Sequence, residues 1–209
     1  MDYELIQALR ETLIMITIPT IISIVFGIPI GACIYLKNRF SIFCNIFVNT
    51  IRSIPYLLFV IILIPLTRLI FSTAFGVLPA TLPLCFVGIA TFSRFVEQSF
   101  CDVNTGVIEL AKSMKVSNYQ LVRYFLIVES RQSLVLGLTS SIISIISYST
   151  VMGIVGGGGI GDYAIRYGYY EFNMQVVYKA ILCIVILVFT IQILGKKISE
   201  ILDKKGIDK

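Results

Sequence analysis

The chain of 209 residues contains no histidine and no tryptophan, and charged residues make up only 14% of it. The absence of histidine excludes Ser-His-Asp and Cys-His catalysis and removes the commonest metal ligand. The five cysteines are odd in number, form no Cys-x-x-Cys motif and lie mostly within apolar runs. Cysteines in such surroundings behave as small apolar residues, so we predict neither a disulfide nor a metal site.

Acidic residues are missing from the middle of every long apolar run. Proton-coupled carriers and pumps generally need such a group within the membrane, so the energy for any transport is expected to enter elsewhere. Ion coupling through backbone carbonyl groups stays open, since broken helices coordinate ions without a carboxylate. An intramembrane enzyme is disfavoured. A passage between these runs is expected to bind its cargo weakly and to be mostly apolar.

The overall composition is that of an integral membrane protein. Hydrophobic residues make up 57% of the chain, and the mean hydropathy is +0.91. The net charge of +5 would suggest nucleic-acid binding in a soluble protein. Here the basic residues lie at the ends of the apolar runs and form no continuous patch with interleaved aromatic residues, so no nucleic-acid partner is expected.

Charge-free runs predict an all-α, polytopic fold with five transmembrane helices in one domain, residues 1–209, because about 20 apolar residues cross the hydrocarbon. The spans are expected at residues 12–36, 50–71, 79–98, 133–154 and 175–195. In the first span, Pro19 and Pro29 predict kinks, and the pair Gly27 and Gly31 predicts close approach of a neighbouring helix. The second span is short, so Arg52 and Arg68 are expected to reach outward from its ends.

The distribution of basic residues predicts the orientation. Most of the 17 lysines and arginines follow the first and third spans or lie in the C-terminal tail. The positive-inside rule places those segments in the cytoplasm. With five spans, the N-terminus is then outside and the C-terminus is cytoplasmic.

The longest polar interval, residues 102–131, predicts a cytoplasmic pair of amphipathic helices between spans 3 and 4. Asn104 and Thr105 are N-cap candidates for the first helix, and Ser117 with Gln120 forms a capping box for the second. In the first helix, the apolar positions Ile108, Ala111 and Met114 are expected to share one face, opposite Lys112 and Lys115. A membrane scaffold would not require such a capped and charged structure. We expect this helix pair to contact a partner protein.

The run from Gly156 to Gly161 formally satisfies the dinucleotide-binding pattern G-x-G-x-x-G. That pattern requires a preceding strand, whereas this run follows a membrane helix. We therefore expect the glycines to permit a sharp turn and close packing at the outer end of the pathway.

Small residues recur along the fourth span at spacings of four and three. This stripe indicates either close helix packing or the lining of a translocation route, and one helix can do both. Its residues are Ser133, Gly137, Ser140, Ser144, Ser147 and Val151.

Several segments together resemble the permeases of ATP-binding-cassette importers. Residues 108–115 followed by 126–128 resemble their E-A-A-x-x-x-G... L-P cytoplasmic loop, with Leu110 in place of Ala, Lys115 in place of Gly and Val128 in place of Pro. Segments 51–55, 64–68, 93–97, 148–149, 156–161 and 167–169 resemble the membrane subunit of methionine importers in particular, along nearly the whole chain.

This resemblance implies a bacterial plasma-membrane permease that moves D- and L-methionine inward by alternating access. Its implied partners are a second permease subunit, two cytoplasmic ATPase subunits that bind ATP and magnesium, and an external substrate-binding lipoprotein. The chain itself would bind no cofactor and catalyse no reaction. Another small amino acid as cargo, or an ion-coupled carrier, are the alternative functions.

The resemblance also assigns roles to particular residues. A coupling helix, seated in a groove of the ATPase with its apolar face anchored, would comprise Glu109, Leu110, Ala111, Lys112, Ser113, Met114 and Lys115. The outer gate and dimer seam would comprise Tyr148, Ser149, Val151 and Met152.

Overall fold

The computed structural model describes residues 2–203, and the remainder of the expected cytoplasmic tail, with Lys204 and Lys205, lies outside the described residues. Within residues 2–203 every regular element is helical, which confirms the predicted all-α class. The elements are α1 (Asp2–Tyr35), α2 (Ser41–Ser53), α3 (Tyr56–Phe71), α4 (Val77–Cys101), α5 (Thr105–Ser113), α6 (Asn118–Gln120), η1 (Leu121–Leu126), α7 (Ile127–Glu129), α8 (Arg131–Met152), η2 (Gly153–Val155), α9 (Gly159–Tyr163), η3 (Ala164–Tyr169) and α10 (Met174–Leu202).

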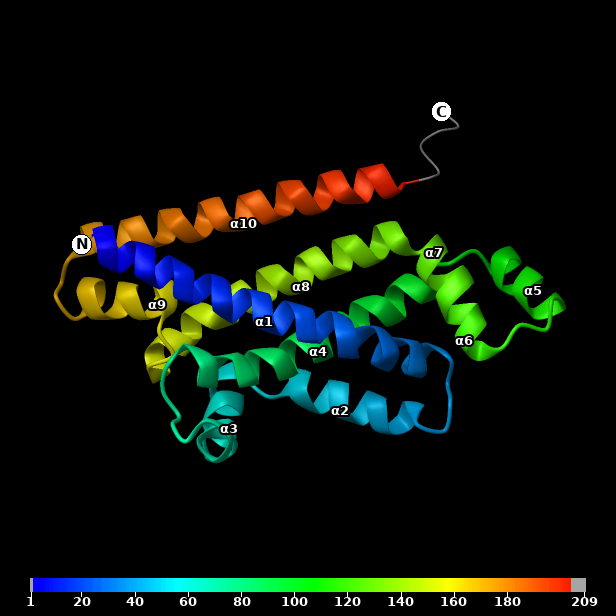
Figure 1. Ribbon diagram of the computed structural model, residues 1–209, viewed down its shortest axis with the longest axis horizontal. Coiled ribbons are helices and arrows are strands. Elements are labelled where there is room, and N and C mark those ends of the chain that lie inside the picture. The colour runs from blue at the N-terminus through cyan, green and yellow to red at the C-terminus, as the bar shows by residue number, and fades with distance from the viewer. Residues whose placement is uncertain (1, 204–209) are drawn as a thin grey trace.

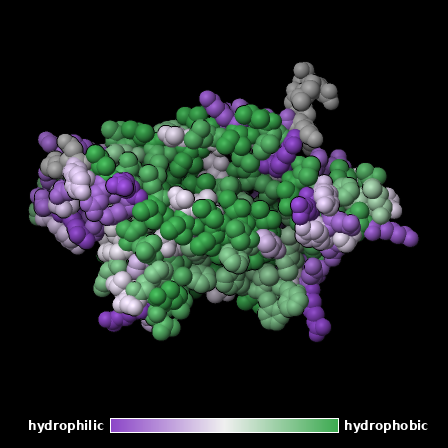
Figure 2. All heavy atoms as spheres, in the orientation of Figure 1, coloured by the Kyte–Doolittle hydropathy of each residue, from purple (hydrophilic) through white to green (hydrophobic). Residues whose placement is uncertain are grey.

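The long helices run along the length of the molecule (Figure 1), and four of them, α1, α4, α8 and α10, are long and apolar enough to cross a membrane. The bent pair α2 and α3 provides the fifth candidate span. The start of α1 lies at one end, and the helix pair formed by α5 to α7 lies at the other, with the end of α10 nearer to it (Figure 1). A hydrophobic belt separates hydrophilic groups at the two ends (Figure 2). This arrangement is that of a polytopic membrane protein.

Close packing of α1 on α4 forms the centre of the fold. A Cβ atom at Gly27 would lie 2.8 Å from Cδ1 of Phe92, and one at Gly31 would lie 2.6 Å from the carbonyl oxygen of Ser93. The prediction that these glycines admit a neighbouring helix is therefore confirmed. Helix α1 continues without interruption through Pro19 and Pro29, and it begins ten residues before the expected span.

The second expected span, residues 50–71, is not one helix. Helix α2 begins at Ser41 and ends at Ser53, and α3 leaves it at an angle of 113°. Ile54 between them is extended, with φ −85° and ψ 129°. A proline at position 55 disfavours helical backbone in the residue before it, because its Cδ clashes with that residue, and it cannot donate a backbone hydrogen bond.

The glycine run after α8 forms a tight reversal. Gly156, Gly158 and Gly159 have φ values of 76°, 82° and 79°. A Cβ atom at Gly161 would lie 2.2 Å from the carbonyl oxygen of Thr150, so α9 packs directly against the backbone of α8. The expectation of a sharp turn with close packing is therefore confirmed. The positive φ values and the close approach to Thr150 both disfavour any residue larger than glycine.

Candidate functional site

A cavity of about 620 Å³ lies between the α2–α3 bend, α4 and α8. Three of the segments on which the sequence resemblance rests meet in its wall: the residues around the bend, the Arg94 to Glu97 turn of α4, and Tyr148 of α8. The lining residues are Ile51, Arg52, Ile54, Tyr56, Val87, Thr91, Arg94, Phe95, Glu97, Gln98, Cys101, Ser144 and Tyr148.

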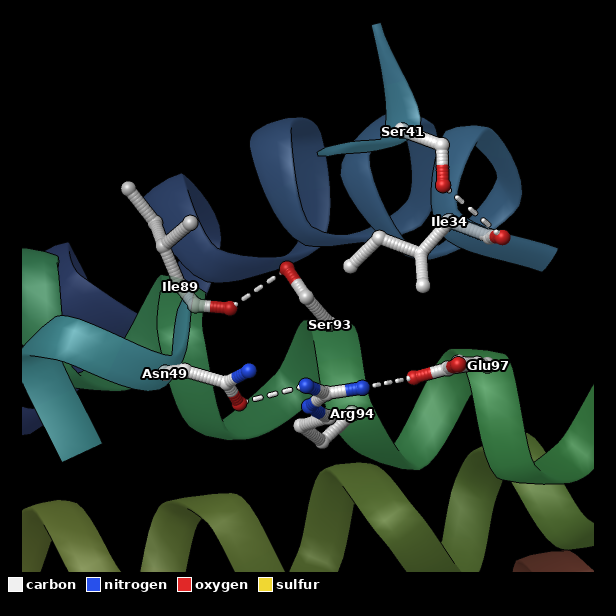
Figure 3. Close-up of polar contacts among 7 residues, drawn as sticks. All are labelled: Ile34, Ser41, Asn49, Ile89, Ser93, Arg94 and Glu97. Atoms are coloured by element: carbon white, nitrogen blue, oxygen red, sulfur yellow. Dashed lines mark hydrogen bonds and ion pairs between the residues drawn. The ribbon is translucent and has the colours of Figure 1, made fainter. Parts of the chain in front are cut away.

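Arg94 connects α2 and α4 by hydrogen bonds on one side of this cavity (Figure 3). Its guanidinium group donates hydrogen bonds to Oδ1 of Asn49 on α2 and to Oε2 of Glu97 one turn further along α4. The side chains of Arg94 and Glu97 are each 24% exposed, so the ion pair is shielded from bulk solvent only in part. Because the pair carries opposite charges, its net charge inside the wall is zero.

The lining of the cavity bears on two expectations. Most of the lining is apolar, but Arg52, Arg94, Glu97 and Gln98 also belong to it, and the sequence analysis did not place these residues in a common wall. Arg52 does not reach outward from a span end, because it occupies the last turn of α2 beside the bend and faces the cavity. The positions of charges along the chain could not reveal the place of Arg52. The bend between α2 and α3 puts a residue that was expected at a span end into the wall of the cavity.

Two tyrosines from different helices stack in the same wall. The ring centroids of Tyr56 and Tyr148 are 4.5 Å apart, with 33° between the ring planes. The hydroxyl of Tyr56 is buried and has no hydrogen-bond partner among the described residues. A buried hydroxyl without a partner is costly.

The four residues assigned to the gate point in different directions. Tyr148 lines the cavity, whereas Ser149 is buried and donates a hydrogen bond of 2.7 Å to the carbonyl oxygen of Ile146. Met152 is 3% exposed and packs within the apolar core beside Met15 and Leu84, although it also lines a second hollow of about 320 Å³. Val151 is half-buried. These positions do not form one continuous surface in the chain.

The small-residue stripe of α8 divides into two parts. Near its start, a Cβ atom at Gly137 would lie 2.7 Å from Cβ of Phe95, and the Ser133 hydroxyl accepts a 3.0 Å hydrogen bond from Ser99 of α4. Further along, Ser140 and Ser147 are exposed and bond only to carbonyl groups of their own helix. The first part serves packing, and the second part is available to a lumen or a second subunit.

Helix α5 presents an exposed surface at the end of the molecule that holds the helix pair. Its N-cap is Asn104, whose side chain accepts a 2.8 Å hydrogen bond from the backbone N–H of Gly106, as predicted. Leu110 is 57% exposed and Met114 is 63% exposed, and Glu109, Lys112 and Ser113 are exposed around them. Two large apolar side chains one turn apart, surrounded by charges, form a surface suited to a groove on another protein.

The predicted orientation of α5 is wrong in one respect. Ala111 is 0% exposed and belongs to the core cluster that contains Phe100, Leu121 and Leu126, with Ile108 packed against it. This face holds α5 against its own chain and cannot anchor it in another protein. Met114 lies on the exposed side, because the spacing of apolar residues alone does not identify which face meets the core.

The turn between the two helices places Lys115 at a position that favours glycine. The N–H of Val116 donates to the carbonyl of Ala111, and the N–H of Lys115 donates to that of Lys112, which is the pattern of a Schellman motif. Lys115 therefore adopts a left-handed conformation with φ 53°, where the resembling loops carry glycine. The capping box of Ser117 and Gln120 begins the next helix, as predicted.

A comparison with known protein families identifies the family of this chain. Residues 23–205 match the family of binding-protein-dependent transport system inner membrane components. The chain belongs to this family. The multi-pass membrane architecture is thus supported both by the apolar helices and by the family, which comprises transport subunits of membranes.

Relatives within this family cover nearly the whole chain. The methionine import system permease protein MetP of Bacillus subtilis is 36% identical over 211 residues, which cover 97% of this chain and 95% of MetP. The D-methionine transport system permease protein MetI of Escherichia coli K12 is 34% identical, covering 73% of this chain and 74% of MetI. A chain of the MetNI methionine ABC transporter in an inward-facing conformation is 31% identical, with a TM-score of 0.94 and 98% of both chains covered.

Several residues of this family member's site were not found by the sequence analysis. Asn49 and Tyr56 gave no local signal, because each acquires its role from a residue on another helix. Glu11, which lies outside this cavity, also gave no local signal, yet its carboxylate accepts a 2.8 Å hydrogen bond from the N–H of Gly159. Arg52 and Arg94 were recognised as residues of the resembling motifs, but their common cavity was not.

Proposed function

We propose that the chain is the membrane-spanning permease subunit of an ATP-binding-cassette importer for methionine, with D- and L-methionine as its cargo. The observation that carries this proposal is the agreement of the whole fold with the inward-facing MetNI methionine transporter, at a TM-score of 0.94 over 98% of both chains. The names of the relatives MetP and MetI support the same cargo.

The permease would work as a homodimer with two ATPase subunits, and an external binding protein would deliver the substrate. The exposed surface of α5, with Leu110 and Met114 at its centre, supports this partnership, because the chain has an apolar contact at the end expected to be cytoplasmic. ATP and magnesium would be bound by the ATPase. Closing of the ATPase pair would move the α5 helices together and open the spans toward the outside.

In the membrane, α5 is assigned to the cytoplasm and the N-terminus to the outside. The support is electrostatic, because the end that carries α5 also carries Lys37, Arg39, Lys112 and Lys115. A single cysteine placed at Lys115 or at Asp162 tests the assignment by labelling of intact cells from outside. Labelling is expected at position 162 and not at position 115, and the reverse would invert the orientation and exclude the ATPase contact.

The cavity beside the α2–α3 bend is the proposed route of the substrate. Its Arg52, Arg94 and Glu97 side chains suit a small zwitterion better than an apolar compound, because charges and hydrogen-bonding groups replace part of the hydration shell. The same lining would also accept another small amino acid, which makes an importer of a different amino acid the second candidate.

Competition in a reconstituted importer tests the function. Permease, ATPase and binding protein are placed in sealed vesicles, and uptake of labelled methionine is measured with excess methionine, glutamine, histidine or lysine. Only methionine is expected to compete strongly, and uptake should require ATP. Stronger competition by glutamine or lysine would overturn the methionine assignment, whereas uptake by the permease alone without ATP would indicate an ion-coupled carrier.

A further inference from the structure

Another large surface hollow lies away from both hollows described above. It has a volume of about 590 Å³ and separates the last two turns of α1 from the second cytoplasmic helix, which comprises α6, η1 and α7. In Figure 1 the helix labelled α6 stands beside the end of α1. We call this hollow the α1–α6 groove. Its lining residues are Ile28, Pro29, Ala32, Cys33, Leu36, Asn38, Asn118, Tyr119, Val122, Arg123 and Ile127.

The groove is apolar at one end and polar at the other. Its α1 wall, from Ile28 to Leu36, carries only apolar residues and lies almost entirely within the candidate membrane span Tyr3–Tyr35. Its opposite end carries Asn38, Asn118 and Arg123, just beyond the end of that span. An occupant must therefore reach into the hydrocarbon layer while a polar part stays at the membrane surface, which a soluble metabolite does not do.

Arg123 supplies a cation at the polar end. One guanidinium nitrogen donates a 2.6 Å hydrogen bond to the Tyr119 hydroxyl, and the guanidinium carbon lies 5.9 Å from the centre of that ring and 5.8 Å from the centre of the Tyr124 ring. The hydrogen bond to Tyr119 raises the pKa of Arg123, so the group stays charged. Among residues 2–203, no ion pair joins Arg123 to a carboxylate.

The two tyrosines therefore orient the guanidinium group without neutralising it. Its planar fork retains N–H donors suited to two oxygens of one phosphate group. Lys37 and Arg39 follow the end of α1 beside the groove and add positive charge at the same membrane surface. Clusters of basic residues immediately beyond a membrane helix attract anionic lipids.

We propose that the α1–α6 groove is a binding site for an anionic phospholipid of the phosphatidylglycerol type, with an acyl chain against α1 and the phosphate group at Arg123. The positive charge of Arg123, Lys37 and Arg39 favours a lipid with a net negative headgroup over a zwitterionic one, and the apolar wall favours a lipid over a soluble phosphate. The bound lipid connects a membrane span to the helix that supports α5. This proposal is independent of the substrate and of the proposed function.

Native mass spectrometry of the delipidated, detergent-purified protein tests the site. Phosphatidylglycerol and phosphatidylcholine with identical acyl chains are added in equal amounts, and bound lipid is counted. We expect the wild type to prefer phosphatidylglycerol by about fivefold, as one well-placed basic residue at a membrane surface provides. Equal binding of both lipids would overturn the proposal.

Matched variants locate the preference. R123Q is expected to remove most of it, leaving only the weaker attraction of Lys37 and Arg39, whereas K112Q, which removes a cation on exposed α5 outside the groove, is expected to retain it in full. Cys33→Trp fills the apolar part of the groove and is expected to reduce phosphatidylglycerol binding while Arg123 stays in place. Each variant is first shown to elute as the wild type does in size-exclusion chromatography, which separates loss of the site from loss of the fold. A preference that R123Q leaves undiminished would overturn the proposal.

Two further measurements separate other occupants. Glycerol 1-phosphate shares the phosphate group but has no acyl chain, and it is expected not to displace the lipid at equal concentration; displacement would show a soluble ligand instead. In native membranes, a bifunctional thiol cross-linker should not join two copies through Cys33, with Cys33→Ser as the control. Cross-linking that depends on Cys33 would identify the groove as a contact between two copies and overturn the lipid assignment.

Discussion

The carboxylate of Glu11 accepts a 2.8 Å hydrogen bond from the backbone N–H of Gly159, although the two residues are separated by 148 positions in the sequence. The neighbouring Thr12 hydroxyl accepts a second 2.8 Å bond from the N–H of Ile160. Helix α1 thereby provides partners for two N–H groups at the start of α9 that the helix itself cannot satisfy. The first helix of the chain thus fixes the reversal that follows α8.

Replacing Glu11 with alanine should lower the stability of the protein. The Gly159 N–H would lose its partner in a partly buried place, at a cost of about 1–3 kcal/mol in the free energy of unfolding. The measurement is thermal unfolding of the detergent-solubilised protein. Glu171→Ala, at an exposed position in the loop before α10, is the control and should change the midpoint little. Equal effects of the two substitutions would show that the bond to Gly159 contributes nothing.

Gly161→Ala should separate α9 from α8. The added Cβ atom would lie 2.2 Å from the Thr150 carbonyl oxygen, and because that neighbour is backbone the helices must move, at a cost of about 1–3 kcal/mol. Gly106→Ala is the matched control, since its Cβ atom would meet only the Asn104 side chain, at 3.3 Å on an exposed surface. The midpoints of thermal unfolding should fall for the first variant and stay near wild type for the second. A tolerated Gly161→Ala would contradict the packing described for the reversal.

Lys115→Gly should stabilise the helix pair. Lys115 has φ 53°, a conformation that glycine adopts without the clash of a Cβ atom, so relief of about 1 kcal/mol is expected. Lys112→Gly removes the same charge from inside α5 and should destabilise by about 1 kcal/mol. Hydrogen exchange at the Val116 N–H, which closes the Schellman motif, should slow in the first variant and quicken in the second. The opposite order would show that the left-handed conformation costs nothing here.

Met114→Ala and Ile108→Ala should have separable effects. Met114 is 63% exposed, so its loss should weaken binding of the ATPase by about 1–3 kcal/mol without changing the stability of the permease. Ile108 packs against the cluster around Ala111, so its loss should lower stability by about 2 kcal/mol or more. Co-purification with the ATPase and thermal unfolding of the free permease measure the two quantities. If only Ile108→Ala lost ATPase binding, and its stability were unchanged, the face that contains Ile108 and Ala111 would be the contact with the ATPase.

Tyr56→Phe should raise the stability of the substrate-free protein. The substitution removes a buried hydroxyl without a hydrogen-bond partner among the described residues, and the gain should be about 1 kcal/mol. If the hydroxyl serves the substrate, the same variant lowers uptake. Tyr148→Phe keeps the stacked ring and is the control for the removal of a hydroxyl as such. A fall in stability for Tyr56→Phe would mean that the hydroxyl already has a partner.

The sequence by itself determined the elements whose signals are local. Lengths of charge-free chain located the four long membrane helices α1, α4, α8 and α10, because each of them must cross the hydrocarbon alone, but they did not reveal the bend between α2 and α3. The N-cap Asn104 and the capping box of Ser117 and Gln120 were predictable, because their side chains bond to backbone groups within three residues. The glycine pair of α1 and the glycine run after α8 indicated close approach, because a missing Cβ atom has the same consequence in any fold.

Only the tertiary structure decided which residues meet. Arg94 contacts Asn49 across 45 positions, and the α2–α3 bend of 113° turns Arg52 toward the same cavity instead of outward. Ala111 faces the core and Met114 faces away from it, although their spacing suggested one common face. The periodicity of a helix defines its faces but not the neighbour that each face receives. The packing of all the helices together, which buries apolar surface, determines that neighbour. The cavity lies between several helices, so it could not be found from the sequence.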